Sequence, residues 1–569
     1  MKSYGAIRYH AGGAASVFAT DDARPEWEVT ATPDVMIRLK RLFPRADKRR
    51  TGAITLVDTP EIARELLWLL HRWTFEVSDE DRRRLTEGAA EHERTEQAVH
   101  AILAGDRPHL DFATELAREP RDYQLVAGDL ALTTHHLLLA DDLGLGKSMS
   151  SLLVLRHPDA LPALIVCPTH LPRQWVNELR KTFPWLRPHI IRSLKPYDPA
   201  RRREMKGYDP DVLVIGYSKL RGWGDHLAGR VRTVIFDEAQ ELRRADSDKY
   251  KAAAQIADQA TFTIGATATP VYNYGGEMHN IMEVLAPGVL GSREEFAREW
   301  GGGAYWHDKL GVADPAALGT YLRDAGLMLR RTRKEVGREL PEVVRVPHTV
   351  EADEEVLDKL TGVAKAPYVA EFVRLLLESE EKVVLFGWHR DVYDIWAERL
   401  AEYNPAFYTG EESPAQKDRA VARFVGGERL EALTTERTPG STIRKCGPEW
   451  AETRLLVVSL RSGAGLDGLQ EAAHVAVFGE LDWSPGMHDQ CIGRLHRDGQ
   501  DEAVVAYFLV SDEGADPVMA EVLNLKRQQA EPIRDPDGEL FEQAEDTRDR
   551  VRRLAADVLK KQRQTRIAA

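Results

Sequence analysis

The chain has 569 residues, of which 43% are hydrophobic and 30% charged, and its formal net charge is −14. This length is too great for one hydrophobic core and predicts about three or four domains. The acidic balance excludes a generally basic protein that coats nucleic acid, so any contact with nucleic acid is expected in a local groove. The three cysteines lie far apart without a CxxC pair, which excludes a disulfide framework and a cysteine zinc site. No apolar signal segment and no run of about 18 apolar residues is present, so we expect a soluble, cytoplasmic protein without membrane contact.

Residues 1–110 are predicted to form a separate small α+β domain. Three segments show the alternation of strands: Ala15–Thr20, Glu26–Ala31 and Gly52–Val57. Helical spacing occupies residues 34–43, and Thr59-Pro60-Glu61 is typical of a helix start, with a capping residue before proline. A further helix is expected to begin at Ser78.

A basic cluster in this domain has two interpretations. It comprises Lys40, Arg41, Arg45, Lys48, Arg49 and Arg50. Such a run either contacts DNA or forms a solvated face, and the sequence leaves both open.

Between residues 115 and 300, short apolar strands alternate with helical segments, as in parallel α/β domains. Five predicted strands each run into a polar cluster: Leu137–Ala140, Ala163–Cys167, Leu213–Ile215, Val231–Phe236 and Thr261–Gly265. Ligands of parallel sheets bind at the carboxyl ends of the strands. The clusters therefore predict a ligand site at that edge of the sheet.

The functional prediction depends most on residues 136–148, which read HLLLADDLGLGKS. After a buried strand, the glycines of the loop 141–146 allow backbone N–H groups to surround a phosphate, and a helix from Met149 directs its positive end toward it. Lys147 supplies charge for the β- and γ-phosphates, and the Ser148 hydroxyl suits Mg²⁺. The pattern GxxxxGK[ST] is incomplete, because Asp141 occupies the position of the first glycine; a plain glycine-rich turn is the alternative. The nucleotide-binding residues predicted here are Asp141, Gly144, Leu145, Gly146, Lys147 and Ser148.

ATP hydrolysis also requires a held Mg²⁺ ion and a positioned water. Asp237, at the end of its strand, is predicted to bind the metal with Ser148, and Glu238 to orient or deprotonate the attacking water. Acidic residues after a strand are also typical of helix caps. The position of this pair, about ninety residues after the phosphate loop, favours the catalytic role.

The rest of the chain is predicted to contain a helical linker or brace at 301–364, a second strand–helix domain at 365–525, and a charged helical tail at 526–569. Strands of the second domain are expected at Val383–Phe386, Leu455–Ser459 and Val475–Phe478. Gly426–Glu452 is polar and is predicted to be a surface insertion, and no hairpin or aromatic wedge that would split strands is expected. The basic amphipathic helix of the tail, residues 548–566, either packs on the second domain or contacts DNA.

Near the end of this second domain, the sequence QCIGRLHRDGQ predicts a helical face that carries Gln490, Arg494 and Arg497 at spacings i, i+4 and i+7. Two arginines on one face either bind surface carboxylates or act as arginine fingers. Fingers stabilise the negative charge that develops when ATP is hydrolysed.

Nine segments between about residues 120 and 510 occur in one order: DDLGLGKS, IVCPTHLPRQWVNE, LVIGYSKL, VIFDEAQ, IGATATP, LRRTRKEV, VVSLRSGAG, DWSP and QCIGRLHRDGQ. Together they resemble the motor of Swi/Snf-type DNA translocases, which are helicase-like ATPases of superfamily 2. The resemblance implies an α/β fold with two RecA-like parallel-sheet lobes and an ATP cleft between them, preceded here by the small N-terminal α+β domain.

The resemblance also implies roles for single residues. Gln124 would read adenine, Lys147, Asp237 and Glu238 would bind and hydrolyse ATP, and Arg494 and Arg497 would be the fingers. Gln240 in the nucleotide site replaces the family's usual histidine, and GATATP and Asp467 also depart from the pattern, which puts the coupling of ATP to DNA movement in question. Contact with DNA, or coupling to it, is implied for Pro168, Thr169, Tyr217, Ser218, Thr267, Trp388, His389 and Gln490. Trp175 and Trp483 are expected to be packing residues.

The sequence thus predicts an ATPase that uses ATP and Mg²⁺ to move along duplex or forked DNA, in a setting that suits a bacterium or a phage. One alternative is a strand-separating helicase on DNA or RNA. Another is a nucleotide-gated DNA-binding scaffold with little turnover, although the presence of Lys147, Asp237, Glu238, Arg494 and Arg497 together argues against it. A protein partner is not identified by the sequence.

Overall fold

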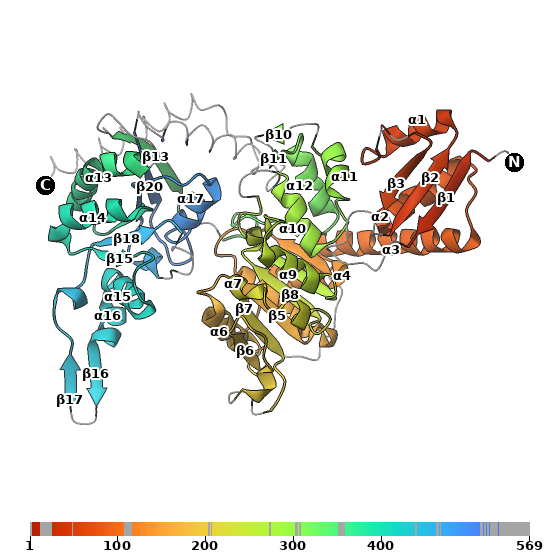
Figure 1. Cartoon of the computed structure of the whole chain (residues 1–569). Helices are drawn as coiled ribbons and strands as arrows, with labels where there is room; N and C mark the ends of the chain where they lie inside the picture. The colour runs from red at the N-terminus through yellow and green to blue at the C-terminus, as the bar shows by residue number, and fades with distance from the viewer. Residues whose placement is uncertain are drawn as a thin grey trace. The chain divides into compact units, whose positions relative to one another are not determined.

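The structure is a computed structural model of the whole chain (Figure 1). It describes residues 3–11, 25–47, 49, 51–106, 116–202, 205, 207–271, 275–301, 305–306, 309–338, 340–350, 359–438, 441–461, 466, 468–511, 516, 519, 523 and 533. The chain divides into two compact units, Met1–Thr332 with Gln529–Asp537 and Arg333–Gln528 with Gly538–Ala569. No helix in the described part of the chain is both long enough and apolar enough to span a membrane. The predicted tail 526–569, with its basic helix, lies outside the described residues except for residue 533.

The first unit begins with a three-stranded antiparallel sheet of β1 (Gly5–His10), β2 (Glu26–Ala31) and β3 (Ala53–Val57) in the order β1-β2-β3. Alternate side chains such as Trp27 and Val29 are fully buried against α1 (Pro33–Leu42) and α2 (Pro60–Arg72). The predicted strands β2 and β3 and both helices are confirmed, while β1 was not predicted. The strand predicted at Ala15–Thr20 lies outside the described residues.

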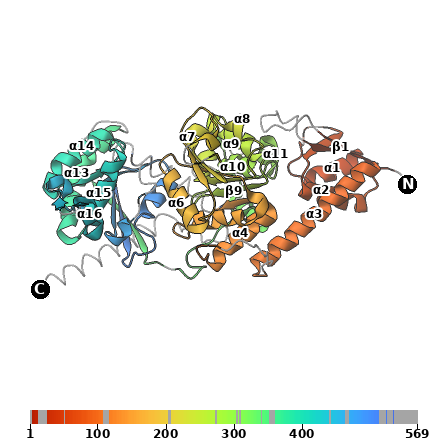
Figure 2. The ribbon, with the colours of Figure 1, turned by 90° about the horizontal axis from the view of Figure 1, so that it is seen from below.

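The helix starts follow the predicted capping signals. The Thr59 side chain accepts a hydrogen bond from the backbone N–H of Ile62 over 3.2 Å, and Ser78 caps α3 (Asp79–Leu103) in the same way. Leu85, near the start of α3, packs in the core of the N-terminal sheet, whereas Val99 and Ile102 pack in the core of the next sheet. The helix therefore links the two parts of the first unit, as Figure 2 shows.

Arg45 of the predicted basic cluster is neither solvated nor available to DNA. Its residue surface is only 6% exposed, and its Nε lies 2.6 Å from the Glu299 carboxylate on α11 (Arg293–Glu299). Its guanidinium also lies 3.8 Å from Glu61, which accepts a hydrogen bond from Tyr321 Oη on α12 (Pro315–Asp324). Glu299 lies 254 residues away from Arg45 along the chain, so a local run of basic residues does not reveal that this charge is buried and paired. Lys48 and Arg50 lie outside the described residues.

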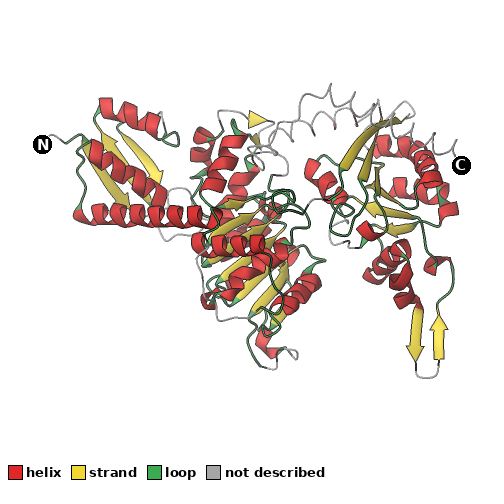
Figure 3. Ribbon diagram, turned by 180° about the vertical axis from the view of Figure 1, so that it is seen from behind, coloured by secondary structure: helices red, strands yellow, loops and turns green. Residues whose placement is uncertain are grey.

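The main part of the first unit is a parallel sheet in the order β12-β4-β9-β8-β5-β7-β6. Its strands are β4 (His136–Leu139), β5 (Ala163–Cys167), β6 (Pro188–Ile191), β7 (Val212–Gly216), β8 (Thr233–Asp237), β9 (Phe262–Ala266) and β12 (Met328–Leu329). Successive residues of one strand face opposite cores: Leu138 packs on one face, and Leu137 and Leu139 pack on the other. Both faces are covered by helices (Figure 3), which is why these strands read as continuous apolar runs. The five predicted strands are confirmed within two residues, and β6 and β12 were missed.

The helices that cover this sheet are α4 (Asp122–Thr134), α5 (Lys147–Leu152), α6 (Pro172–Thr182), α7 (Tyr217–Leu220), α8 (Gly224–Leu227), α9 (Asp248–Ala257), α10 (Glu277–Leu285), α11 and α12.

The segment 301–364 differs from the predicted helical linker. It contains the short antiparallel pair β10 (Tyr305–Trp306) and β11 (Lys309–Leu310), then α12, whose Leu318 and Leu322 belong to the core of the first unit. Strand β12 joins the sheet of the first unit, and β13 (Val343–Val350) joins that of the second. The segment is thus divided between the two units. A strand as short as β12 is too short to show an alternating pattern in the sequence.

The second unit contains a six-stranded parallel sheet in the order β13-β20-β19-β14-β18-β15. The strands after β13 are β14 (Val383–Gly387), β15 (Ala406–Tyr408), β18 (Leu455–Ser459), β19 (Val475–Phe478) and β20 (Val504–Ser511). The helices are α13 (Lys359–Ser379), α14 (Arg390–Arg399), α15 (Pro414–Val425), α16 (Gly427–Thr434) and α17 (Pro485–Ile492). The predicted α/β fold with two parallel-sheet lobes is confirmed.

The predicted insertion at 426–452 forms α16 and an antiparallel hairpin of β16 (Thr435–Thr438) and β17 (Ser441–Arg444). The expectation that the chain has no extra hairpin is therefore wrong. These polar strands have no apolar alternation, and the Pro-Gly pair between them in the sequence was the available turn signal. The insertion is held at its base, because Lys382 Nζ donates to the carbonyl of Phe424 over 2.8 Å and contacts the Glu452 carboxylate at 2.7 Å.

The acidic groups around Arg45 predict a pH-dependent stability of the first unit. Burial, followed by the nearby Glu61 carboxylate, raises the pKa of Glu65 to about 7, against the opposing effect of Arg45. Its pKa in the unfolded chain is about 4.3. The folded state therefore binds the proton more tightly, and the stability that this provides is lost as the pH rises through about 7. We expect Glu65→Gln to raise the melting temperature by about 2–4 °C at pH 8 and by much less at pH 5.

Thermal unfolding of both proteins at several pH values measures this effect. Glu93→Gln, which removes one charge from an exposed position on α3, is the matched control. Its melting temperature is expected to differ from that of the unmodified protein by the same amount at every pH. A constant difference for Glu65→Gln as well would contradict the assignment.

Candidate active site

The phosphate loop follows β4 directly and ends where α5 begins at Lys147. Gly146 has a φ of +75°, and a Cβ at this position would lie 2.6 Å from Nε2 of Gln124. Only glycine fits such a backbone position without displacing Gln124. The helix begins two residues earlier than predicted and tightens into a 3₁₀ turn at Leu153–Arg156.

Lys147 is directed back over the loop. Its Nζ donates to the carbonyl oxygens of Asp141 at 2.7 Å and Asp142 at 3.0 Å. Burial is the largest influence on this ammonium group and lowers the pKa of Lys147 to about 8, while the Asp141 carboxylate opposes the shift. Ser148 follows in the first turn of α5, partly buried.

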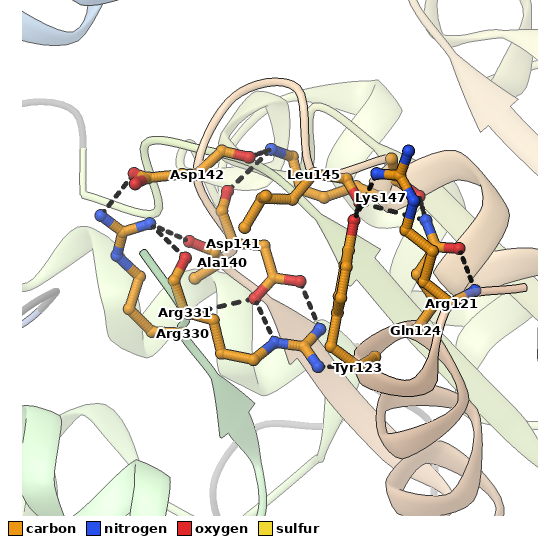
Figure 4. A network of polar contacts seen from close by, with 11 residues as sticks. Arg121, Tyr123, Gln124, Ala140, Asp141, Asp142, Leu145, Lys147, Arg330 and Arg331 are labelled. Carbon is orange, nitrogen blue, oxygen red and sulfur yellow. Dashed lines mark hydrogen bonds and ion pairs between the residues drawn. The ribbon is translucent and has the colours of Figure 1, made fainter. Parts of the chain in front are cut away.

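Asp141, which departs from the phosphate-loop pattern, is fully buried and paired with Arg331 (Figure 4). The Arg331 Nε lies 3.0 Å from Asp141 Oδ1, and the Arg331 backbone N–H donates to the same oxygen over 3.1 Å. The neighbouring Arg330 pairs with Asp142 at 2.7 Å. The two ion pairs are therefore crossed: the first aspartate pairs with the second arginine, and the second aspartate with the first arginine.

Gln124 is buried beside the end of the loop. Its Nε2 donates to the carbonyl of Leu145 over 3.1 Å, and its Oε1 accepts from the backbone N–H of Arg121 over 3.0 Å. Tyr123 Oη donates to the same Leu145 carbonyl over 3.0 Å. The structure therefore brings residues 121–124, which read RDYQ, and the phosphate loop together (Figure 4), as the predicted nucleotide site requires.

Asp237 ends β8 in the same unit, and two side chains hold it by hydrogen bonds. The indole N–H of Trp175 donates to Asp237 Oδ2 over 2.8 Å, and the Tyr217 hydroxyl donates to the Asp237 backbone carbonyl over 3.0 Å. Burial and then the Glu238 carboxylate raise the pKa of Asp237, whereas the Trp175 hydrogen bond and the Lys147 charge oppose this. Leu139 and Asp237 both pair with Ala266 in the sheet, so the phosphate loop after β4 and the acidic pair at the end of β8 lie at the same edge.

Glu238 adopts a left-handed backbone conformation with a φ of +54°, which is uncommon for a residue other than glycine. Its Oε2 accepts a hydrogen bond from Nε2 of Gln240 over 2.6 Å. Gln240 is only 5% exposed, so its side chain orients Glu238. This contact gives a physical role to the glutamine that replaces the usual histidine.

The other predicted coupling and DNA-contact residues of this unit lie at the carboxyl ends of the strands. Thr267, after β9, is buried, and its backbone N–H donates to the Leu139 carbonyl over 3.0 Å. Thr169 and Ser218 are exposed, and Pro168 is partly buried. Tyr217 is 5% exposed and holds Asp237, so its position does not suit the predicted contact with DNA. Its side chain packs in the hydrophobic core on one face of the sheet. Its position after a strand in the sequence did not indicate this burial.

Arg494 and Arg497 lie in the second unit, but not on a helical face with Gln490. Helix α17 includes Gln490 and ends at Ile492, with Gly493 as its cap, and the two arginines follow in turns. The N–H groups of Arg494 and Leu495 donate to the carbonyls of Cys491 and Ile492 over 3.1 and 2.9 Å. The i, i+4, i+7 prediction is therefore wrong, because the glycine ends the helix before the arginines.

Trp388 and His389 follow β14 at its carboxyl end. Glu480, at the end of β19, accepts hydrogen bonds from both backbone N–H groups, over 2.6 and 2.9 Å, and contacts His389 Nδ1 at 2.7 Å. The Trp388 side chain is 39% exposed, with the Arg461 guanidinium 4.4 Å from its ring centre. An exposed aromatic ring and a neighbouring cation thus lie at the carboxyl ends of β14 and β18.

The residues of the first unit fit a nucleotide with Mg²⁺. The glycine position beside Gln124 leaves a backbone cradle that a side chain would fill, and Lys147 supplies a cation. Ser148 and Asp237 offer the hard oxygen donors that Mg²⁺ prefers. Within the described ranges, no group of three His, Cys, Asp or Glu side chains is placed to hold a metal ion. Mg²⁺ needs no such group, because phosphate oxygens and water supply most of its ligands.

Three residues of this site were not identified from the sequence. Tyr123 and Arg331 lie within segments that the sequence analysis used, but no role was predicted for them. Trp175 was predicted to be a packing residue. The sequence feature that could have indicated the pairing of Arg331 was the two adjacent aspartates of DDLGLGKS together with the two adjacent arginines of LRRTRKEV. Trp175 is indeed buried at 3% exposure, but its indole N–H has a specific acceptor in Asp237.

Comparison with known proteins supports the predicted resemblance. The SNF2-related domain family matches residues 63–358, slightly more than half of the chain. The mouse (Mus musculus) DNA annealing helicase and endonuclease ZRANB3 is 26% identical over 441 residues, which cover 69% of this chain and 38% of that protein. A Caenorhabditis elegans homologue of the SWI/SNF-related matrix-associated actin-dependent regulator of chromatin subfamily A-like protein 1 is also 26% identical, over 68% of this chain and 58% of its own length. The chain therefore spans well under two thirds of these relatives.

Among solved structures, the Sulfolobus solfataricus SWI2/SNF2 ATPase core in complex with dsDNA is similar over 74% of this chain and 94% of its own. The sequence identity is 19% and the TM-score is 0.35, and no argument rests on this similarity.

The hydrogen bond between Trp175 and Asp237 predicts an effect on Mg²⁺ use. Trp175→Phe removes the donor while keeping an aromatic ring, so Asp237 loses a group that fixes its rotamer and favours its charged form. We expect the Mg²⁺ concentration for half-maximal ATP turnover to rise, and turnover at moderate Mg²⁺ to fall by about tenfold.

Turnover measured across a Mg²⁺ titration tests this expectation. Trp223→Phe is the matched control, because Trp223 is also fully buried in the first unit and its indole N–H donates to the Ser193 carbonyl over 2.9 Å. It is expected to change stability without changing the Mg²⁺ dependence. Equal Mg²⁺ dependence for both variants would show that Trp175 only packs.

Proposed function

The chain belongs to the SNF2-related domain family, and from this we propose that it is a DNA translocase that couples ATP hydrolysis to movement along duplex DNA. The observation that supports this most is the joining of the phosphate loop, Asp237 and Glu238 at the ends of β4 and β8 in one parallel sheet. Two segments distant in sequence provide what ATP hydrolysis requires: the phosphate loop supplies the backbone cradle and the cation, and the end of β8 supplies the acidic pair. We propose further that the protein acts in the cytoplasm.

Each residue of this site has a proposed task. Lys147 binds the β- and γ-phosphates, Gln124 reads adenine, and Ser148 with Asp237 would hold Mg²⁺. The metal, when bound, neutralises charge on the phosphate oxygens. Glu238, oriented by Gln240, accepts the proton of the attacking water. Arg494 and Arg497 stabilise the negative charge of the transition state as fingers.

Contact with DNA is proposed for the exposed strand ends. Thr169 and Ser218 lie at the carboxyl ends of β5 and β7, and the exposed Trp388 beside Arg461 occupies the corresponding end of β14. The names of the relatives, a DNA annealing helicase among them, support DNA as the partner. Hydroxyl, backbone and cationic groups bind phosphate and sugar, so binding is expected to depend on salt and little on sequence.

A strand-separating helicase is the second candidate, and the hairpin β16–β17 favours it. The base of this insertion is fixed on both sides, by Lys382 and by the hydrogen bond from Arg423 Nε to the Ala451 carbonyl over 2.8 Å. An element that parts two strands must resist their force, and a hairpin rooted in this way has the required support.

The two candidates are separated by a comparison of triplex displacement with unwinding. We expect ATP hydrolysis to rise many-fold when duplex DNA is added, and a third strand wound on the duplex to be displaced only with ATP. A forked duplex is expected to stay paired. Lys147→Ala, which removes the phosphate-binding cation, serves as the inactive control.

The other outcomes are equally informative. Efficient unwinding of the fork without triplex displacement would favour the helicase, and a variant that lacks residues 435–444 would then test the hairpin. ATP turnover without either movement would indicate a switch that grips DNA. Equal hydrolysis with and without DNA would contradict all of these motor assignments.

Arg497 is expected to affect chemistry more than binding. Lys147→Ala removes a group that meets the ground-state phosphates, so ATP affinity and turnover both fall. Arg497→Ala is expected to leave affinity nearly unchanged while turnover falls by about 10³-fold, because a finger acts mainly on the transition state. Nucleotide titration and turnover at saturating ATP measure the two effects. A loss of affinity with normal turnover at saturation would show that Arg497 is not a finger.

A further inference from the structure

We propose that Arg331 is a positioning residue that holds the phosphate loop in the shape that binds nucleotide. The proposal rests on the proposed function, because it assigns a partner to the same loop. Arg331 lies 190 residues after Asp141 in the sequence and follows β12, the edge strand of the sheet. It does not touch the place expected for the phosphates; it acts through the residues that shape the loop.

The first set of contacts made by Arg331 fixes the start of the phosphate loop. Asp141 is fully buried, and only 12% of the Arg331 side chain is exposed. The guanidinium meets the carboxylate in the paired geometry, with Nε on Oδ1 at 3.0 Å and Nη2 on Oδ2. A buried bidentate pair of this kind gives directional hydrogen bonds as well as charge, so it sets the orientation of Asp141.

The second set of contacts made by Arg331 connects it to the end of the loop through Tyr123. Nη1 of Arg331 donates to the Tyr123 carbonyl, and the guanidinium carbon lies 5.2 Å from the centre of the Tyr123 ring. The Tyr123 hydroxyl in turn donates to the Leu145 carbonyl. One guanidinium thus connects both ends of the loop, as Figure 4 shows, and a shift of Arg331 would release both.

The backbone adds a third connection. The N–H of Ala140 donates to the Leu329 carbonyl over 2.8 Å, and the N–H of Asp142 donates to the Arg331 carbonyl over 3.0 Å. These bonds extend the pairing of β12 with β4 into the loop. Lys147 Nζ bonds to the carbonyl oxygens of the same two aspartates, so the position of this cation also depends on the segment that Arg331 holds.

This arrangement explains why an aspartate stands where the phosphate-loop pattern has glycine. At that position the side chain points away from the cradle and into the pair with Arg331. Arg331 is also followed by only one residue, Thr332, before the chain enters the second unit. Nucleotide binding that tightens the loop is therefore expected to tighten residues 327–332 as well.

The experiment is a double-mutant cycle on nucleotide affinity, with a fluorescent mant-ADP as the probe. Arg331→Gln leaves Asp141 buried without its partner, a change that costs stability by itself. The double variant Arg331→Gln with Asp141→Asn removes both charges and leaves no unpaired one. We expect each single variant and the double variant to bind mant-ADP about tenfold more weakly, with no further loss in the double, because the two residues act as a unit.

The matched control is the pair Arg187 and Asp211, which is also bidentate, with 2.9 Å on both bonds, and lies in the first unit beside the opposite edge strand β6. Arg187→Gln with Asp211→Asn is expected to leave mant-ADP affinity unchanged. Melting temperatures measured on the same samples separate stability from positioning. Hydrogen exchange at residues 327–332 is expected to slow when nucleotide binds to the unmodified protein, but not to the double variant.

Unchanged affinity in the double variant would overturn the proposal. If the double variant does not fold, mant-ADP binding by Arg331→Lys is the test, because lysine keeps the charge but not the paired geometry. Weaker binding supports the positioning role, and equal binding refutes it. Failure of the unmodified protein to bind mant-ADP would refute the proposed function itself, and this inference with it.

Discussion

The parallel register of β4, β9 and β8 is the constraint on which the site depends. Parallel neighbours present their carboxyl ends at one edge, so the loops after Leu139, Ala266 and Asp237 meet there although Leu139 and Ala266 are more than a hundred residues apart in the sequence. The backbone bond from Thr267 to the Leu139 carbonyl extends this pairing beyond the strands. Because helices cover both faces of the sheet, the edge is the place where polar groups can gather without loss of core packing.

Placing several charged groups at this edge of the sheet costs desolvation free energy, which contacts from the surrounding structure offset. Lys147, Asp141 and Asp237 are each withdrawn from water to some degree, and an unpaired buried charge is strongly unfavourable. Each has a specific partner: backbone carbonyls for Lys147, Arg331 for Asp141, and the Trp175 indole for Asp237. The partners come from segments outside the loop, so the site is a property of the whole first unit.

Within the first unit, the N-terminal sheet is joined to the nucleotide-binding sheet by the same kind of interaction. Arg45 is buried between Glu61 and Glu299, and α3 places Leu85 in one core and Val99 in the other. A buried, hydrogen-bonded charge and a continuous helix both oppose independent motion of the two parts. The small sheet is therefore expected to move with the nucleotide-binding sheet.

The sequence by itself determined the central strands of the two parallel sheets and the phosphate loop, because both depend on local patterns: continuous apolar runs for β5 or β18, and glycines at fixed spacing before Lys147. It also determined the family, through motifs that keep one order along the chain. Only the tertiary structure decided the partner of Asp141, the burial of Tyr217 and Arg45, and the membership of β12 in the first sheet. Each of these depends on contacts between residues far apart in sequence, which no local periodicity records. The end of α17 before Arg494 is the local exception, since Gly493 was visible but the assumed helical spacing was carried past it.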